Sequence, residues 1–524
     1  MSTTSSTARL IHYNGRPTKR NQVLASLVIS LGPFAAGMGK GYSSPALASL
    51  ETSVLPDGLR VTPQEASWIL AISLLGALVG DVVGGVAMNQ GRKRLLQCSS
   101  LPFALVWLLT VFANHVAMIL VSSFIGGVCS AVILLTSHIY VSEDCPPLKP
   151  SSIIPPSFLP EDCPPLKPSS IIPPSFLPED CPPLKPSSIP PPSFLPEIAS
   201  PEIRGRLCSL SKITSNLGML TCYILGYFMG WRQLALVSAA FPLILFMLVM
   251  WLPETPSFLL FRGDEEDAEE SLQWLRGEEA FVQGELEELK ISVSVNRRFK
   301  PRSFTDIFWD QTLRRSTLIT CSLVFFQKFT GAFVLNSDAV RVFSKTFFLL
   351  DAHLVAIVHA SLQLASSLAC GLFIDRLGRV PLLKTGMLVV SLALFLLGSH
   401  IYFTVDRDSP AKTSSEILPL VCVIVFTVAY SGSIGPLTSL LISELFPLEF
   451  RGRGGALATG IGHACGFIVV KTFLDFELLL CLSGTFWTYA AISLGGAIFV
   501  SVAVPETKGR SLDDIQRDME KSTW

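Results

Sequence analysis

Charge is scarce in this 524-residue sequence, and its scarcity excludes several classes of protein. Only 15% of the residues are charged, whereas 49% are hydrophobic, and the formal net charge is −1. A soluble domain of this length has no core large enough to hide so many apolar residues, so the main solvent must be lipid. A nearly neutral chain also lacks the basic field that recruits nucleic acid, and no nucleic-acid partner is expected.

Signals for processing, cross-linking and catalysis are missing as well. The sequence has no Asn-x-Ser/Thr glycosylation site, and its twelve cysteines show neither metal-site spacing nor a secreted disulfide framework. The segment before Asn21 has no apolar core followed by a cleavage site, so the first hydrophobic segment is predicted to be a retained helix. Because no phosphate loop, metal set or nucleophile elbow occurs in a suitable context, the sequence predicts no enzyme, no cofactor and no metal.

What the sequence does contain is a series of long apolar runs. About 20 helical residues cross the roughly 30 Å of hydrocarbon in a bilayer. Runs of that length form two groups of six, separated by a charged stretch, which predicts an all-α membrane protein with twelve transmembrane helices in two six-helix bundles. The predicted spans are 23–42, 66–87, 95–113, 116–141, 208–230, 233–252, 316–337, 352–374, 381–403, 417–441, 454–474 and 484–504.

The distribution of basic residues predicts cytoplasmic termini. With that orientation the cytoplasmic segments contain basic clusters, whereas the outer loops contain only scattered Lys and Arg, as the positive-inside rule requires. The resulting organisation is a cytoplasmic N-terminus (1–22), an N-terminal bundle (23–252) interrupted by an insert (144–197), a cytoplasmic linker with short helices (253–315), a C-terminal bundle (316–504) and a cytoplasmic C-terminus (505–524).

The two halves repeat short motifs in the same order. EIASPEIRGR (197–206) corresponds to ELFPLEFRGR (444–453), and LPETPS (252–257) corresponds to VPETKG (504–509). Matching order and spacing indicate duplicated six-helix units, the organisation in which transporters place a substrate site between two halves. With GLFIDRLGR (371–379), NQGRK (89–93), FFQKFTG (325–331) and GPLTSLLISE (435–444), the sequence resembles the sugar-porter family of the major facilitator superfamily, which includes hexose facilitators and insect trehalose facilitators.

The resemblance implies a facilitative sugar transporter, for a hexose or a trehalose-like sugar, that works by alternating access. The plasma membrane is the default location because the sequence shows no retention signal or acidic dileucine signal, with an intracellular membrane as the alternative. Proton-coupled relatives typically have an Asp after the first-helix aromatic residue, whereas here Ser43 follows Tyr42, which favours facilitated diffusion. Two alternatives stay open from the residues: a transporter of a more anionic organic solute, and a sugar sensor that does not transport. The expected partners are the small-molecule solute and the lipid bilayer.

One block of the sequence has no counterpart in the family. Residues 144–197 contain three tandem copies of an eighteen-residue unit, DCPPLKPSSIIPPSFLPE, which is too rich in proline to continue a helix. A polyproline II conformation would offer a PxxP surface to an adaptor domain, but the composition favours a passive insert. Either Glu143 or Glu197 can therefore fill the acidic position of the motif beside the insert.

Charged residues at the cytoplasmic helix ends are predicted to gate the transporter. Opposite charges there can hold the two halves together when the inner gate shuts, and the resemblance implies this role. The first-half copy departs from the family, since Met88 replaces an acidic residue and Ser122 replaces the helix-four Arg, which predicts a looser inner gate. The predicted gating residues are Arg92, Glu143, Glu197, Arg204, Asp375, Arg376, Arg379, Glu444 and Arg451.

The predicted substrate site combines amides and hydroxyls, the two-way hydrogen-bonding groups that sugars require. Gln327 and Gln363 occupy positions that resemble polar contacts of the family, although a buried Gln also joins membrane helices. Other positions depart from the family: Lys328 replaces the second Gln of a pair, Phe333 an Asn, Lys212 a Gln and Ser431 an acidic residue, while Ser439 and His463 replace Trp.

Lysines inside a membrane are costly and usually have a partner or an anionic ligand. Lys212 and Lys328, together with Lys40, are predicted to line one cavity, and Asp81 is a candidate partner. The substitutions therefore predict a substrate more anionic than the usual sugar of the family, with internal pairing of the lysines as the alternative.

Overall fold

The computed structural model describes residues 20–52, 61–143, 201–277, 282–298, 306–406, 416–446 and 450–508, and every regular element among them is helical. In the first half these are α1 (Arg20–Thr52), α2 (Pro63–Ala87), α3 (Arg92–Val111), α4 (Val116–Glu143), α5 (Pro201–Phe228) and α6 (Trp231–Met250). The predicted insert at 144–197, between α4 and α5, lies outside the described residues, and so does Glu197.

The second half contains α11 (Gln311–Lys328), α12 (Ala332–Ser337), α13 (Ala339–Thr346), α14 (Ala352–Leu377) and α15 (Arg379–Ile401). They are followed by α16 (Ile417–Ala429), α17 (Gly435–Leu445) and α18 (Arg451–Ala503). A residue with non-helical dihedrals, Cys481, divides α18 into two helices. Counting α11–α12, α16–α17 and the two parts of α18 as spans, the described residues contain the predicted six spans in each half.

The linker between the halves folds into α7 (Pro256–Arg262), α8 (Glu265–Arg276), α9 (Gln283–Arg298) and α10 (Asp306–Trp309). Helices α7–α9 bury a small apolar cluster that includes Leu260, Leu272 and Leu289. Arg276 and Glu285 form a largely buried ion pair of 2.6 Å between α8 and α9. Asn21 of α1 donates to the carbonyl of Trp274 at 2.8 Å, so this unit is attached to the N-terminal bundle.

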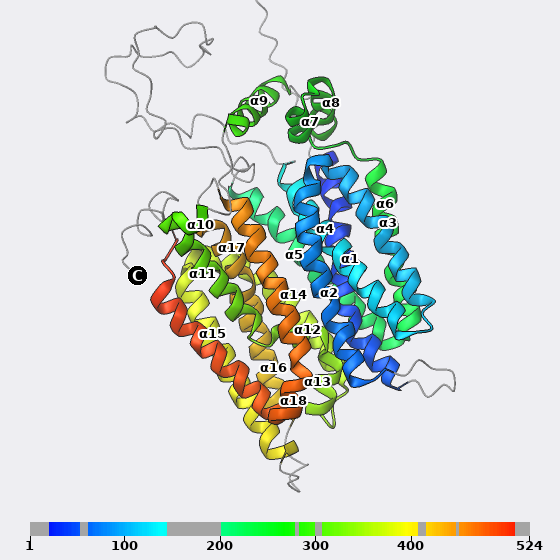
Figure 1. Cartoon of the computed structure of the whole chain (residues 1–524), viewed down its shortest axis with the longest axis vertical. Coiled ribbons are helices and arrows are strands. Elements are labelled where there is room, and N and C mark those ends of the chain that lie inside the picture. The colour runs from blue at the N-terminus through cyan, green and yellow to red at the C-terminus, as the bar shows by residue number, and fades with distance from the viewer. Residues whose placement is uncertain are drawn as a thin grey trace, which may run out of the picture.

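Figure 1 shows the two halves side by side, with α7–α10 at one end of the bundle. We call this end the linker side and the other end the opposite side. Helix α1 packs on α5 and α6, α2 on α4, and α15 on α18. The largest contacts that join the halves are α2 with α18 and α5 with α14, and α1 also touches α12 and α13. Each half also has its own apolar core.

The outer surface of the helices is apolar. Eight helices in the described residues are long and apolar enough to cross a membrane by length and composition. Their exposed side chains include Val86, Leu105, Leu392 and Phe395, which in water would form an unfavourable apolar belt but in lipid face a matching solvent.

Two predicted spans differ from the structure in detail. The span 316–337 is not one helix, because α11 ends at Lys328 and α12 begins at Ala332. Gly331 sits between them with φ +79°, a left-handed conformation that most L-residues avoid. The span 417–441 is not a regular α-helix throughout, because Tyr430–Ile434 form a π-helical turn between α16 and α17.

Candidate functional site

Three lysines from three helices come together inside the bundle. Lys40 lies on α1, Lys212 on α5 and Lys328 at the end of α11, so both halves contribute. The three charges act on one another, and the carboxylate of Asp81 on α2 acts on Lys40 and Lys328. Lys40 and Lys212 are nevertheless exposed, which shows that solvent reaches the space they share.

Lys328 has an aromatic neighbour within its own half. Its ammonium group lies 4.0 Å from the ring centroid of Phe333, at the distance of a cation–π contact. Phe333 belongs to α12 and packs against the apolar core of the N-terminal half. The two residues that depart from the family at this position are therefore in contact with each other, at the boundary between the halves.

His463 has a protein partner. Its Nδ1 atom lies 2.7 Å from Oδ2 of Asp81, and the two side chains are 22% and 11% exposed. This contact joins α18 of the C-terminal half to α2 of the N-terminal half. The sequence analysis placed His463 in the substrate site and considered Asp81 a partner for lysine, whereas the structure pairs these two residues with each other.

Gln327 bonds to the irregular turn of the tenth span. Its Nε2 group donates to the carbonyl oxygens of Gly435 at 3.2 Å and of Ile434 at 3.4 Å. These carbonyls lie where the π-helical turn changes to α17, a place where regular backbone hydrogen bonding is perturbed. Gln327 therefore fixes α11 to the start of α17.

Gln363 is buried on α14 beside a polar contact between the halves. Asn216 of α5 donates to Ser367 Oγ at 2.8 Å, and Ser367 in turn donates to the carbonyl of Gln363 at 2.7 Å. The side-chain oxygen Oε1 of Gln363 has no hydrogen-bond partner among the described residues, although Gln363 is only 6% exposed. A buried acceptor without a donor is costly, and a substrate hydroxyl would supply the missing donor.

The two serines of the predicted site differ in position. Ser431 is buried within the π-helical turn. Ser439 is exposed on α17, and its hydroxyl donates to the carbonyl of Gly435 at 3.4 Å.

Asn216 and His359 belong to this interior although the sequence analysis did not select them. His359 on α14 is buried, with Nδ1 2.7 Å from Thr427 Oγ1 and Nε2 3.1 Å from Asn336 Oδ1. It therefore joins α12, α14 and α16. Isolated polar residues in apolar runs were the available signal, but they do not reveal which helix faces which.

On the linker side, the repeated PET motifs make equivalent contacts in both halves. Glu254 accepts the backbone N–H groups of Arg92 at 2.9 Å and of Lys93 at 3.0 Å, at the start of α3. Glu506 accepts the backbone N–H groups of Arg379 and Val380, both at 3.0 Å, at the start of α15. Each carboxylate thus satisfies free N–H groups at a helix N-terminus, where negative charge is favoured. The motif duplication predicted from sequence is therefore also a structural one.

Two of the predicted gating residues, Arg379 and Glu444, form an ion pair within the C-terminal half. Arg379 Nη2 is 3.4 Å from Glu444 Oε1, and Thr507 donates to Glu444 Oε2 at 2.6 Å. This group joins α15, α17 and the segment after α18, all in the C-terminal half. In the N-terminal half, Arg92 donates to the carbonyl of Met88 at 3.3 Å and lies over the ring of Phe258.

The other predicted gating side chains are not described. Those of Glu143, Arg204, Asp375, Arg376 and Arg451 lie outside the described residues, although their backbones are helical. The interpretation of Ser122 as part of the inner gate is wrong. Its hydroxyl accepts from Thr110 at 2.9 Å, near the end of α3 that is farthest from Arg92.

The carboxylate of Glu506 predicts a measurable pH dependence. Burial raises its pKa, but the backbone N–H groups of Lys508, Arg379, Val380 and Thr507 outweigh burial, and the net pKa is lowered. A lowered pKa stabilises the fold above the unfolded-state pKa, and this contribution is lost as the pH falls through the folded pKa. We therefore expect purified Glu506→Gln to melt below wild type at pH 7, and the difference to shrink below about pH 4.5. Thermal unfolding of both proteins in detergent across this range tests it; a pH-independent difference would contradict it.

On the opposite side, hydrogen bonds join the halves directly. Ser44 of α1 accepts from the backbone N–H of Val340 at 2.9 Å, and Tyr223 of α5 donates to the carbonyl of Asn336 at 2.6 Å. Lys471 of α18 donates to Ser67 of α2 at 3.0 Å. The halves are thus held together at this end by hydrogen bonds from α1, α5 and α18.

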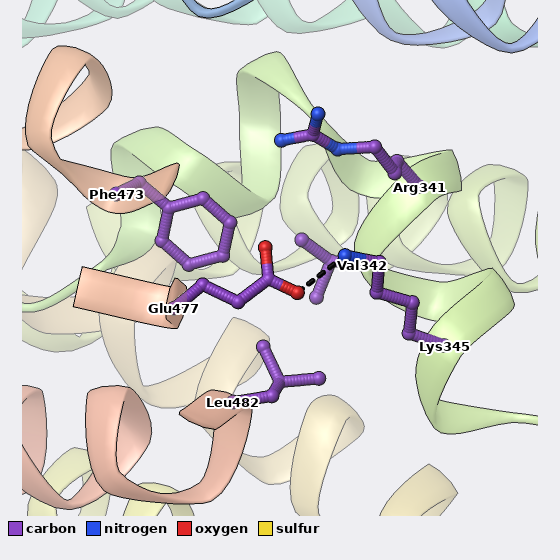
Figure 2. A pocket seen from close by; sticks show the side chains of 6 residues that line it. All are labelled: Arg341, Val342, Lys345, Phe473, Glu477 and Leu482. Atoms are coloured by element: carbon purple, nitrogen blue, oxygen red, sulfur yellow. Dashed lines mark hydrogen bonds and ion pairs between the residues drawn. The ribbon is translucent and has the colours of Figure 1, made fainter. Parts of the chain in front are cut away.

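A small pocket on the opposite side is separate from Lys40, Lys212 and Lys328. Figure 2 shows it between α13 and α18, with Lys345 paired to Glu477 across it. Its lining residues come only from the C-terminal half, so it does not lie between the halves. The pocket is lined by Arg341, Val342, Lys345, Phe473, Glu477 and Leu482.

Comparisons with known proteins agree with this architecture. The chain matches the family model "Sugar (and other) transporter" over residues 187–519 and the "Major Facilitator Superfamily" model over residues 29–150. It is similar to the facilitated trehalose transporter Tret1 of Apis mellifera ligustica, with 30% identity over 97% of this chain and 91% of the relative. The corresponding protein of Polypedilum vanderplanki is 29% identical over 95% of this chain and 88% of the relative.

A solved structure confirms the predicted fold. The inward open conformation of the xylose transporter XylE from E. coli superposes with a TM-score of 0.71 at 21% identity, covering 95% of this chain and 99% of that chain. The predicted major facilitator architecture, with two six-helix bundles, is therefore confirmed.

Proposed function

Because the chain belongs to the sugar transporter family of the major facilitator superfamily, we propose that it is a facilitative transporter that moves a sugar across the membrane. The observation that carries this proposal is that family similarity extends over both six-helix halves. Similarity to the Tret1 proteins, named as facilitated trehalose transporters, favours a disaccharide or hexose as the substrate. The polypeptide itself performs no covalent chemistry.

The polar groups between the halves support a sugar site. Gln363 presents a buried acceptor beside the Asn216–Ser367 hydrogen bond, and Gln327 lies at the π-helical turn of the tenth span. Hydroxyls of a sugar both donate and accept, so amide side chains from facing helices recognise them well. Phe333 adds an aromatic surface at the boundary between the halves.

The contacts between the halves support alternating access. The opposite side is joined by hydrogen bonds from Ser44, Tyr223 and Lys471, whereas Lys40 and Lys212 remain open to solvent. A transporter exposes its site to one side at a time, and this arrangement fits a state that is open toward the linker side. The basic residues at that end favour its assignment to the cytoplasm.

Uptake into proteoliposomes tests the proposed function. Purified full-length protein is expected to give saturable equilibration of labelled hexose or trehalose, because binding between two halves saturates while leakage does not. The Gln363→Leu variant keeps similar volume but removes the buried acceptor, and we expect its apparent affinity to fall about tenfold or more.

The matched control is Gln273→Leu, which makes the same substitution on α8, in the linker and outside the proposed site. Its uptake should equal that of wild type. No saturable flux of any sugar by folded protein would overturn the proposal, and a sugar that binds without flux would favour the sensor. Flux unaffected by Gln363→Leu would remove this residue from the site.

We also propose that the protein lies in the plasma membrane, as expected for a sugar facilitator that supplies cells. Its membership of a multi-pass membrane family supports a membrane location, and surface biotinylation of intact cells tests the plasma membrane in particular. Recovery only from internal membranes would contradict this proposal.

A further inference from the structure

The lysine cluster, defined as Lys40, Lys212 and Lys328, contains more positive charge than its surroundings balance. Asp81 is the carboxylate that acts on Lys40 and Lys328, and it is already bonded to His463. His138 on α4 also faces the charges of Lys40 and Lys212. Among the described residues, three ammonium groups thus share one carboxylate.

Lys40 and Lys328 lie far from the starts of their helices. At 1.5 Å per residue, Lys40 lies about 30 Å from the start of α1 and about 18 Å from its end. Lys328 is likewise about 26 Å from the start of α11. A lysine side chain is too short to reach either membrane surface from such positions, so these two ammonium groups remain in the interior.

The cost of this arrangement points to a ligand. Cations within the membrane interior are expensive and normally pair with an anion. In the described part of the chain, neither Lys40 nor Lys212 has a hydrogen bond or ion pair with a protein group. Lys328 lies over the ring of Phe333, and its charge is otherwise countered at a distance, by Asp81. Lys40 and Lys212 are exposed to solvent, so an anion that enters the space between the halves can reach them.

A second, neutral part of the same space is suited to hydroxyls. Lys212 and Asn216 are four residues apart on α5 and therefore share a face. Asn216 bonds to Ser367, one turn from Gln363, whose buried Oε1 has no partner in the described residues. Since α5 and α14 run in opposite directions, Lys212 and Gln363 lie about 12 Å apart along the helices. One ligand can thus meet cations at one end and amides at the other.

We propose that the preferred substrate is a sugar that bears a negatively charged group, a carboxylate or a phosphate ester, and that the lysine cluster binds that group. This inference rests on the proposed transport function and adds the charge of the substrate. Lys40 and Lys212 come from the N-terminal half and Lys328 from the C-terminal half, so the anion binds to both. Charge-assisted hydrogen bonds from several ammonium groups give the anionic sugar its advantage over the neutral one.

Competition in proteoliposomes tests the inference. Wild-type protein takes up labelled glucose or trehalose while neutral and anionic competitors are compared as matched pairs: glucose with glucuronate and with glucose 6-phosphate, and trehalose with trehalose 6-phosphate. At least one anionic member should inhibit at a concentration about tenfold lower than its neutral partner. The glucuronate and phosphate arms identify which anion is preferred. Direct uptake of the labelled anionic sugar then distinguishes transport from blockage.

Substitutions in the lysine cluster test whether it causes the preference for the anionic sugar. Lys212→Gln and Lys328→Gln should each lower the anionic-to-neutral preference about tenfold, and the double variant should abolish it. Lys384→Gln, on an exposed position of α15, is the matched control and should keep the wild-type preference. Size-exclusion and thermal unfolding show whether each variant is folded, and Lys→Arg at the same positions should retain the preference.

The outcomes separate this inference from the proposed function. Transport of neutral sugar with no anionic preference, or a preference unchanged in the double variant, overturns the charged-substrate inference and leaves sugar transport intact. Absence of any saturable flux by folded protein overturns both. An anionic sugar that inhibits uptake but is not itself transported also overturns the inference, because it would be an inhibitor and not a substrate.

Discussion

Gly76→Leu is expected to abolish folded protein, because α2 and α4 touch through their backbones at this residue. A Cβ added at Gly76 would lie 2.1 Å from the carbonyl oxygen of Phe124, and one at Gly127 would lie 2.0 Å from that of Ser73. Neither carbonyl can move without shifting its helix, since it belongs to a helical backbone. Close crossings at small residues are a main source of association between membrane helices. A leucine at Gly76 would therefore force α2 and α4 apart.

A graded series measures the effect. Gly76→Ala introduces the smallest clash and is expected to destabilise the protein by about 3 kcal/mol, at the upper end for overpacked cores. Gly85→Ala lies on the same helix with no atom within 4 Å of its added Cβ. It should be neutral or stabilise by up to about 1 kcal/mol through helix propensity. Yield of monodisperse protein and thermal unfolding in detergent provide the measurement, and equal melting of Gly76→Ala and Gly85→Ala would show that the crossing tolerates a side chain.

The spans were predictable because membrane thickness fixes the length of an apolar helix. The boundaries 66–87 and 233–252 lie close to those of α2 and α6, at Pro63–Ala87 and Trp231–Met250. Each of these runs is bounded by polar or turn residues, so its length carries the information. The same criterion missed the break before α12. The apolar pattern continues through that break, and only the backbone conformation of Gly331 interrupts it.

The site was predictable as a set of positions but not as a set of partners. The cationic substitutions at Lys212 and Lys328 were visible against the family pattern, and the structure places their charges within reach of one another. The pairing of His463 with Asp81 was not visible, because the residues are far apart in sequence and hydropathy does not define how helices are rotated. The carboxylate contacts of Glu254 and Glu506 had a signal in the duplicated PET motif, although the motif alone does not identify the helix N-termini they bind.

Glu444→Ala is expected to lower the transport rate at least tenfold. Glu444 supplies the carboxylate that pairs with Arg379 and accepts from Thr507, at the linker end of the C-terminal half. The facing end of the N-terminal half is basic, with Arg92, Lys93 and Arg94 at the start of α3. When the linker side closes, removal of Glu444 would bring Arg379 toward these cations without its acidic partner. Like charges then oppose closure, and about 1.4 kcal/mol of opposition suffices for a tenfold shift between the two states.

The same variant should also be less stable than wild type. A substitution in an exposed ion pair serves as the control. The Arg379 and Glu444 side chains are 16% and 20% exposed, so loss of the carboxylate should cost about 2–3 kcal/mol, somewhat less than for a fully buried pair. Glu287→Ala removes one of the two carboxylates paired with Lys290 on the linker surface, where Glu287 is 64% exposed, and should cost less than about 1 kcal/mol with normal transport. Exchange of labelled sugar and thermal unfolding are measured on the same preparations. A Glu444→Ala protein that is destabilised but transports at the wild-type rate would make this pair structural and remove it from the gate, because a gate residue must affect the two states unequally.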